Sequence, residues 1–214
     1  MANNDCSDKI KTKEILEKIT PEKALELLKE GNKRFLSGNP AERDHHWHIR
    51  ETIDSQHPFA LIHGCIDSRV EPSIIFDQGI GDLFITRIAG NIINDDILGS
   101  MEYACAVTGS KLIVVLGHTS CGAVKGACDD VKLGNLTASL KNIRDVIGRM
   151  GLGKNAGCNS TNNDLVNRVA LKNVETVIEE IKAGSKVLKE LYDSGKIDIT
   201  GAMYNHTNGK VDFI

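Results

Sequence analysis

Two long apolar runs stand out in the hydrophobic pattern of the chain, over residues 58–64 and 111–117. Neither run alternates with polar positions, which is typical of strands covered on both faces in a parallel sheet. A third strand is predicted over 82–88. Near the C-terminus the pattern predicts a strand over 196–205 and a partner over 210–214, joined by a turn that contains an Asn-Gly pair.

Helical patterns alternate with these strands. They cover 72–77, 95–107, a helix that opens at Gly122, 137–150, and 164–192 with a break at 184–185. Alternating strands and helices predict an α/β fold with a central, mainly parallel β-sheet flanked by helices. The carboxyl ends of the strands are then the edge where a functional site is expected.

Residues 1–37 predict an N-terminal helical arm that precedes this alternation. Its helical pattern runs from Lys13 to about Ser37, and Thr20 followed by Pro21 is a typical N-cap and first helical residue, which divides the pattern into two helices. Because the arm lies outside the strand–helix alternation, we expect it to clasp a neighbouring subunit.

The connector between the arm and the first strand, residues 39–56, is polar and contains His45, His46 and His48. Three nearby histidines raise the possibility of a metal site. They have no ligand partners at the strand ends, so we interpret the segment as an ordinary polar loop.

Composition narrows the class of protein further. The 214 residues are 41% apolar and 26% charged, which predicts one globular domain over residues 1–214, with the arm at 1–37 and the chemical core at 58–128. A net charge of −3 gives no reason to expect nucleic acid or an anionic membrane as a partner, and no apolar stretch reaches the roughly 20 residues of a membrane span. Six irregularly spaced cysteines and no visible export signal predict a cytoplasmic protein.

Three candidate metal ligands follow the two long apolar runs. Cys65 comes directly after the first run, and His118 and Cys121 follow the second. Adjacent parallel strands would bring all three to one edge of the sheet. Thiolate and imidazole are ligands that zinc prefers, and three protein ligands leave the open position of a catalytic site. Cys128 is excluded, because seven residues of helix, or about 10.5 Å, separate it from Cys121.

An acid–base pair is predicted beside these ligands. Asp67 and Arg69 alternate with Cys65, so an extended backbone would point all three side chains the same way. Two thiolates would cancel the charge of the zinc ion, which makes a nearby proton acceptor more important. Asp67 is suited to that role or to serve as an exchangeable fourth ligand, and a bidentate pair with Arg69 would hold it away from the metal.

These motifs resemble those of the β-class carbonic anhydrases. The resemblance rests on Cys65-Ile66-Asp67-Ser68-Arg69 and His118-Thr119-Ser120-Cys121-Gly122, and extends through 76–84, 87–91 and 98–104. It implies reversible hydration of carbon dioxide to bicarbonate and a proton by attack of zinc-bound hydroxide, with one Zn²⁺ per chain. It also implies that Cys65, His118 and Cys121 are the zinc ligands, that Asp67 and Arg69 form the catalytic pair, and that the protein is a homodimer or homotetramer.

Other interpretations remain open from the sequence. The same zinc site would suit a carbonyl sulfide or carbon disulfide hydrolase. A non-enzymatic zinc or redox module is a further alternative, with Asp67 as the fourth ligand of a structural site and its pairing with Arg69 as a simple salt bridge.

Overall fold

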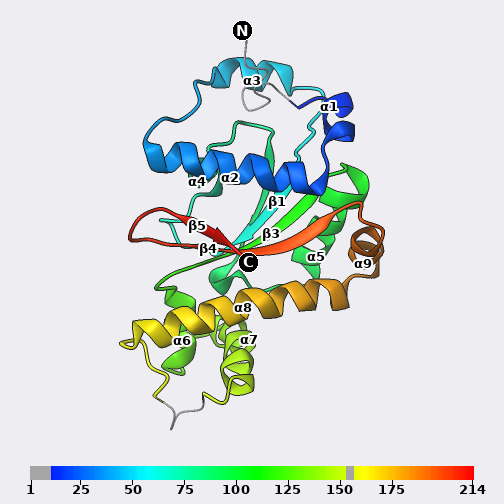
Figure 1. Cartoon of the computed structure of the whole chain (residues 1–214). Coiled ribbons are helices and arrows are strands. Elements are labelled where there is room, and N and C mark those ends of the chain that lie inside the picture. Colours follow the sequence, from blue (N-terminus) through cyan, green and yellow to red (C-terminus); the bar gives the residue numbers. More distant parts are fainter. Residues whose placement is uncertain (1–10, 153–156) are drawn as a thin grey trace.

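A five-stranded sheet with helices on both faces forms the centre of the computed structural model, which describes residues 11–152 and 157–214 (Figure 1). The strands are β1 Ala60–Gly64, β2 Leu83–Arg87, β3 Leu112–His118, β4 Asp198–Tyr204 and β5 Val211–Phe213. Their order is β2-β1-β3-β4-β5, and only β5 is antiparallel to its neighbour. The prediction of a mainly parallel α/β sheet is confirmed.

Apart from one helix in the 39–56 connector, the helices also follow the predicted pattern. They are α1 Lys13–Lys18, α2 Pro21–Ser37, α3 His45–Glu51, α4 Pro72–Ile75, α5 Asp95–Glu102, α6 Gly122–Cys128, α7 Leu136–Arg149, α8 Asn163–Gly184 and α9 Lys186–Asp193. The predicted helix over 95–107 ends in a π-helical segment, Tyr103–Val107. No described helix has the length and apolar character needed to cross a membrane.

Alternate residues of the central strands pack against opposite helical layers. Ile62 and Val114 face the cluster that contains α1 and α2, whereas Leu61 and Ile113 face the cluster that contains α5, α8 and α9. Figure 1 shows these layers, with α2 on one side of the sheet and α8 on the other. Both faces are therefore buried, which explains why the two long apolar runs do not alternate.

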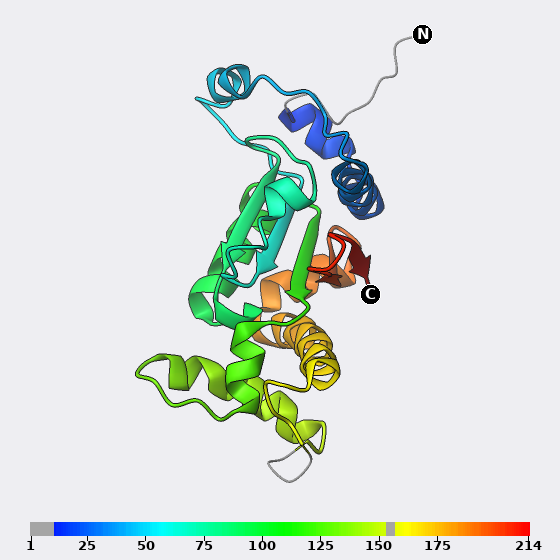
Figure 2. The same ribbon diagram turned by 90° about the vertical axis from the view of Figure 1, so that its left-hand side faces the viewer.

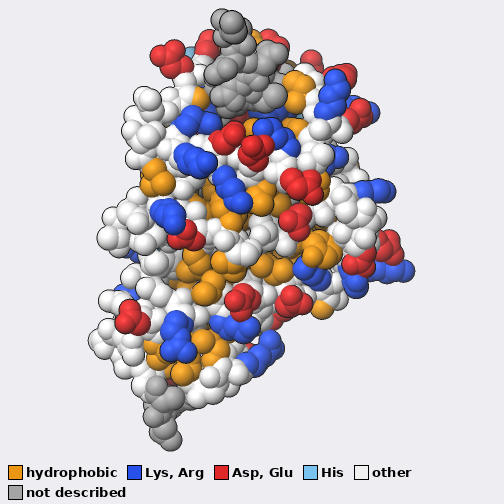
Figure 3. Space-filling model, in the orientation of Figure 1, with side chains coloured by type: hydrophobic (Ala, Val, Ile, Leu, Met, Phe, Trp, Pro, Cys, Tyr) orange, Lys and Arg blue, Asp and Glu red, His pale blue; other side chains and the backbone are white. Residues whose placement is uncertain are grey.

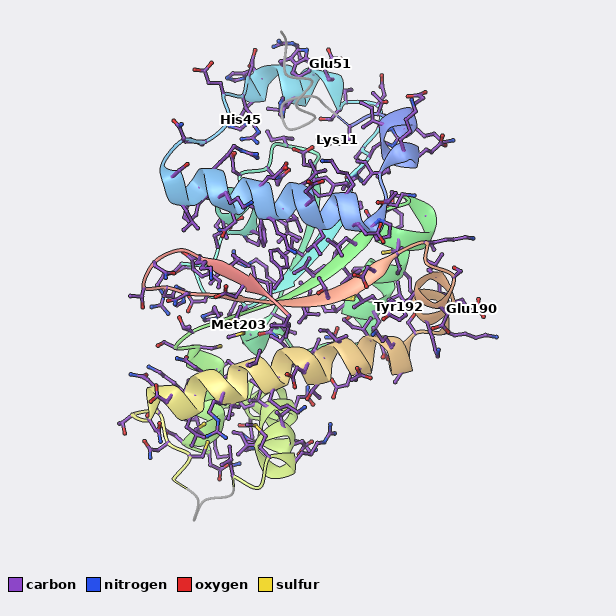
Figure 4. All side chains as sticks on the ribbon, in the orientation of Figure 1. Lys11, His45, Glu51, Glu190, Tyr192 and Met203 are labelled. Carbon is purple, nitrogen blue, oxygen red and sulfur yellow. The ribbon has the colours of Figure 1, made fainter. Side chains whose placement is uncertain are left out.

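Helices α6 and α7 lie beyond the carboxyl ends of the strands, at the opposite end of the molecule from α3 (Figure 2). They form a third apolar cluster with the first half of α8. The side chain of Met203, labelled in Figure 4, packs between β4 and α8 and would meet a Cβ atom added at Gly117. The absence of a side chain at Gly117 therefore lets α8 approach the sheet closely next to His118.

The N-terminal arm packs on its own sheet. Thr20 caps α2 through a hydrogen bond from the Lys23 backbone N–H, as predicted. Leu27 and Leu28 of α2 belong to the same buried cluster as Phe59. The predicted contact with a second subunit stays a prediction, and residues 1–10 of the arm lie outside the described residues.

The connector over 39–56 is not simply a loop, and that prediction is wrong for its middle part. His45–Glu51 form helix α3, capped by the Asp44 side chain, which accepts a hydrogen bond from the Trp47 backbone N–H. His48 is buried within it. The helix was missed because seven polar-rich residues carry no apolar stripe. Among the described residues, none of these histidines belongs to a group of potential metal ligands.

A buried carboxylate fastens the arm to the rest of the fold. Asp77 accepts hydrogen bonds from Arg34 of α2, from Arg43 at 2.5 Å, and from the Ala41 backbone N–H at 3.1 Å. Burial acts to raise the pKa of Asp77, but the two guanidinium groups lower it below its ordinary range. The start of the arm has a second anchor, because Lys11, labelled in Figure 4, pairs with the buried Asp82 at 3.1 Å.

We expect Asp77→Asn to lower the free energy of unfolding and to make that free energy depend less on pH. The folded-state pKa of Asp77 lies below that of the unfolded chain, so its contribution is complete above the unfolded value of about 3.9 and is lost as pH falls toward the folded one. Unfolding in urea should show a loss of about 1–3 kcal/mol at pH 7 and a weaker decline of stability between about pH 5 and pH 3. Asp145→Asn, in an exposed pair with Lys141, is the matched control. An equally steep acid decline in Asp77→Asn would contradict the expectation.

Candidate metal centre

Two neighbouring strands bring three potential metal ligands to one edge of the sheet. β1 and β3 are parallel, with Gly64 opposite Leu116. Cys65 follows the end of β1, and His118 is the last residue of β3. The ligand atoms of Cys65, His118 and Cys121 all lie within 4.8 Å of one another, and all three residues are buried. The structure thus brings together the residues that the sequence separates widely.

The distances within this group suit a tetrahedral ion. The two sulfur atoms are 3.9 Å apart. Two sulfurs bound to one tetrahedral zinc at about 2.3 Å each would be about 3.8 Å apart. His118 Nε2 is buried and has no hydrogen-bond partner among the described residues, although a buried ring nitrogen normally has one. The donor set and its spacing therefore fit Zn²⁺.

The backbone between His118 and Cys121 turns sharply. Ser120 has a φ of 55°, in the left-handed region that costs a non-glycine residue about 1 kcal/mol. Its backbone N–H donates to the Asn167 side-chain oxygen of α8 at 2.8 Å. The turn leads into α6, so that Cys121 stands at the start of that helix. Asn167 was not predicted from the sequence, because nothing in a helical pattern indicates which residue supports a distant turn.

The two thiols share their hydrogen-bonding environment. The hydrogen bond with Cys121 lowers the pKa of Cys65, and the same interaction raises the pKa of Cys121. The Gly90 backbone N–H also points to the Cys65 sulfur at 3.3 Å, which favours a thiolate there. One thiolate forms readily, whereas a second beside it is unfavourable without a cation. A divalent ion would stabilise both.

Asp67 and Arg69 form the expected pair, although the predicted extended backbone is wrong beyond Asp67. A turn begins at Ser68, and the Asp67 carboxylate accepts from the Arg69 backbone N–H at 3.0 Å. The Arg69 side chain then donates to both carboxylate oxygens, at 2.9 and 2.7 Å. These hydrogen bonds lower the pKa of Asp67 well below its ordinary range. Asp67 Oδ2 is 3.9 Å from His118 Nε2, so the carboxylate lies beside the ligand group.

A small, mainly apolar cavity opens beside Cys65 and Asp67. Its volume is about 390 Å³, and its walls include Ala123 and Leu140. Such a cavity suits a small uncharged substrate. A larger cavity of about 710 Å³ lies near Asp77 and His45, away from the ligand group.

The remaining histidines and cysteines fall into different environments. His63 is fully buried and bonded to Thr86 at 3.0 Å and to the Ile92 carbonyl at 2.9 Å, as expected of a core histidine. His206 was not predicted to matter, yet its Nε2 lies 2.9 Å from His118 Nδ1. Burial lowers the pKa of His206. No periodicity marks His206, because it lies in the turn between β4 and β5.

Cys128 belongs to no potential ligand group among the described residues, in agreement with its exclusion above. Cys105 is buried in the apolar cluster that contains α5 and α9. Cys158 is buried in the apolar cluster that includes residues of α6 and α7.

A buried Cys-His-Cys group at the carboxyl edge of a parallel sheet, with a carboxylate beside it, is typical of zinc enzymes that activate water. A family model described as carbonic anhydrase matches residues 60–211. The chain is 38% identical to carbonic anhydrase 2 of Mycobacterium tuberculosis, over 89% of this chain and 91% of that protein. It is 35% identical to the carbonic anhydrase of Mycolicibacterium smegmatis, over 90% and 92% of the two chains.

Solved structures agree with these relatives. The β-carbonic anhydrase CafA of Aspergillus fumigatus superposes with a TM-score of 0.71 at 27% identity, covering 79% of this chain and 81% of that one. A β-carbonic anhydrase of Sordaria macrospora shares the fold, with a TM-score of 0.70 at 24% identity, covering 79% and 90%. The chain belongs to the β-carbonic anhydrase family. Its reaction is the reversible hydration of carbon dioxide to bicarbonate and a proton.

We expect Asn167→Ala to weaken the turn between His118 and Cys121. Removing the acceptor leaves the half-buried Ser120 N–H without its partner, which should lower the free energy of unfolding by about 1–3 kcal/mol. Urea denaturation of the metal-free protein measures the loss. Asn163→Ala, at an exposed position of the same helix, is the matched control. Equal stability of the Asn167 and Asn163 variants would contradict the supporting role of Asn167.

Proposed function

We propose that the chain holds one Zn²⁺ through Cys65, His118 and Cys121 and uses Asp67 and Arg69 as its catalytic pair. The observation that carries the proposal is the convergence of two buried sulfurs, 3.9 Å apart, with the unpartnered Nε2 atom of His118. The chain belongs to the carbonic anhydrase family, and it matches relatives named carbonic anhydrase over most of their length. Assignment of each residue to its role is our inference from this geometry.

A zinc ion in this group would supply a Lewis acid that makes a water molecule nucleophilic near neutral pH. Two thiolates cancel the charge of the ion, so the gain in acidity is smaller than for an all-histidine group. Asp67 compensates by accepting the proton or a hydrogen bond from the nucleophile. Arg69 holds both Asp67 oxygens, which keeps the carboxylate beside the ligand group and limits its approach to the metal.

The apolar cavity contributes by excluding water from the substrate. The cavity lies next to Asp67 and is lined by Ala89, Ala123 and Leu140. These apolar walls suit carbon dioxide, which needs no strong hydrogen bonds. Bicarbonate, being charged and hydrated, is favoured to leave. A carbonyl sulfide or carbon disulfide hydrolase would use the same group, and a non-enzymatic module would not need the Asp67–Arg69 pair. Neither alternative is favoured by the relatives.

We also propose that residues 1–214 form a single domain, that the protein works as a homodimer or homotetramer in the cytoplasm, and that the arm at 1–37 contributes to assembly. Several large apolar side chains are exposed in the single chain, among them Ile66, Ile74, Tyr103 and Val107. Figure 3 shows apolar side chains gathered across the middle of one face, with charged side chains above and below them. Burial of such surface supports association.

Metal content tests the proposed ligands. We expect about one zinc per chain in protein purified without chelators, and loss of both zinc and carbon dioxide hydration on treatment with a strong chelator. Cys65→Ser should abolish stoichiometric zinc binding, whereas Cys105→Ser, at a buried cysteine outside the group, should not. Elemental analysis and stopped-flow hydration give the two readouts. Full zinc occupancy in Cys65→Ser would reject the site.

Substitution of the catalytic pair tests the role of Asp67. Asp67→Asn should lower kcat for hydration by about 10²–10⁴-fold while zinc content is retained, because the nucleophile loses its acceptor. Arg69→Ala should approach that loss, since the carboxylate is no longer held in place. Arg50→Ala, in the exposed ion pair with Asp44, is the control for a removed arginine. Undiminished hydration by Arg69→Ala would refute the role given to Arg69.

A further inference from the structure

A second imidazole contacts the candidate metal ligand His118 at its Nδ1 atom. His206 Nε2 lies 2.9 Å from His118 Nδ1, and the two rings meet edge to face at 70° with centroids 4.9 Å apart. The contact joins two residues that are 88 positions apart in the sequence. His118 ends β3, whereas His206 lies in the turn between β4 and β5.

The position of His206 is fixed by several further contacts. Its backbone N–H donates to the Thr119 side-chain hydroxyl at 3.1 Å, next to His118 itself. Its ring meets the Tyr204 ring edge to face at 5.2 Å. The turn is closed by a hydrogen bond of 2.8 Å from the Asn205 N–H to the Lys210 carbonyl. His206 is therefore held against His118 by the whole C-terminal hairpin.

The chemistry of a neutral imidazole gives this contact a direction. If His118 binds a metal through Nε2, its remaining proton is on Nδ1, and Nδ1–H must donate. His206 Nε2 is then the acceptor and its own proton is on Nδ1. The opposite arrangement, in which His206 Nε2–H donates to His118 Nδ1, puts the His118 proton on Nε2 and blocks metal binding. The tautomers of the two rings are thus coupled through one hydrogen bond.

Within the described part of the chain, His118 Nδ1 has one other acceptor at hydrogen-bond distance, the carbonyl of Thr119 at 3.0 Å. That carbonyl belongs to the next residue and moves with His118. His206 comes from a separate strand connection and can fix the ring relative to the sheet. Asp67, His118 and His206 also form a group with metal-ligand spacing. The two ring nitrogens in that group are at hydrogen-bond distance, and thiolates are the softer ligands for zinc, so the Cys65 and Cys121 group is favoured.

We propose that His206 is a positioning residue, which accepts the hydrogen bond from His118 Nδ1 and thereby holds the His118 tautomer whose Nε2 lone pair faces Cys65 and Cys121. The inference rests on the proposed zinc site. Partners of this kind, one step removed from the metal, contribute about 10- to 100-fold in metal affinity. In this role the effect of His206 on the reaction is exerted through His118.

Zinc affinity of the full-length protein, measured by competition with a chromogenic chelator at constant pH, tests the proposal. His206→Leu removes the acceptor and should weaken zinc binding by about 10- to 100-fold. His206→Gln keeps a side-chain acceptor at a similar reach and should recover most of the loss. His46→Leu, at an exposed histidine of α3, is the matched control and should bind zinc as the unsubstituted protein does.

Nitrogen NMR of the His118 ring supplies a readout that packing alone would not change. The zinc-free protein should carry its His118 proton mainly on Nδ1, and His206→Leu should shift the population toward Nε2–H. Unchanged zinc affinity in His206→Leu would overturn the proposal and leave the Thr119 carbonyl as the sufficient acceptor. Equal losses in His206→Leu and His206→Gln with an unchanged His118 tautomer would also overturn it, in favour of a packing role.

Cys65→Ser separates this inference from the proposed function. If Cys65→Ser abolishes zinc binding while His206→Leu leaves it intact, only the role of His206 fails. If zinc binding is indifferent to Cys65→Ser, the proposed ligand group fails, and the inference about His206 fails with it.

Discussion

The parallel pairing of β1 with β3 is the constraint on which the site depends. Gly64 lies opposite Leu116, so Cys65 emerges at the level where β3 reaches His118. A shift of one residue in this register would turn every side chain of β1 to the opposite face and move Cys65 away from its partners. The register is strongly specified, because both faces of these strands are buried against helices. The packing of the core thus sets the geometry of the chemistry.

Electrostatics makes the packed group receptive to a cation. Two cysteines buried 3.9 Å apart cannot both ionise at modest cost, and their hydrogen bond lowers the pKa of Cys65 while raising that of Cys121. A divalent ion removes this conflict, since it stabilises both thiolates. The negative charge of the nearby Asp67 carboxylate would also attract the ion. Arg69 offsets that charge, because it donates hydrogen bonds to both carboxylate oxygens. Pairing with Arg69 therefore favours Asp67 as a hydrogen-bond acceptor beside the metal over Asp67 as a metal ligand.

The sequence alone predicts those parts of the fold and of the site that follow from the pattern of apolar residues and from the rules of parallel sheets. The strands, most helices and the convergence of Cys65 with His118 and Cys121 follow from apolar runs and from the rule that parallel strands end at one edge. Helix α3 was missed because it has no apolar stripe, and the turn at Ser68 because an extended backbone was assumed where the Asp67 side chain bonds to the next residues. Asn167 and His206 were beyond reach, since only tertiary packing brings them to the site.

Support for the ligand group comes from three separate parts of the chain outside the two ligand motifs at 65–69 and 118–122. The Gly90 backbone N–H approaches the Cys65 sulfur, Asn167 of α8 holds the turn before Cys121, and the C-terminal hairpin brings His206 to His118. Each contact acts on a different ligand. The short motifs therefore specify which atoms are available, whereas helix α8 and the hairpin at the end of the sheet specify how those atoms are oriented. A tetrahedral ion requires its ligand atoms to be correctly oriented. Helix α8 and the C-terminal hairpin are therefore as much part of the metal centre as the two strands that carry the ligands.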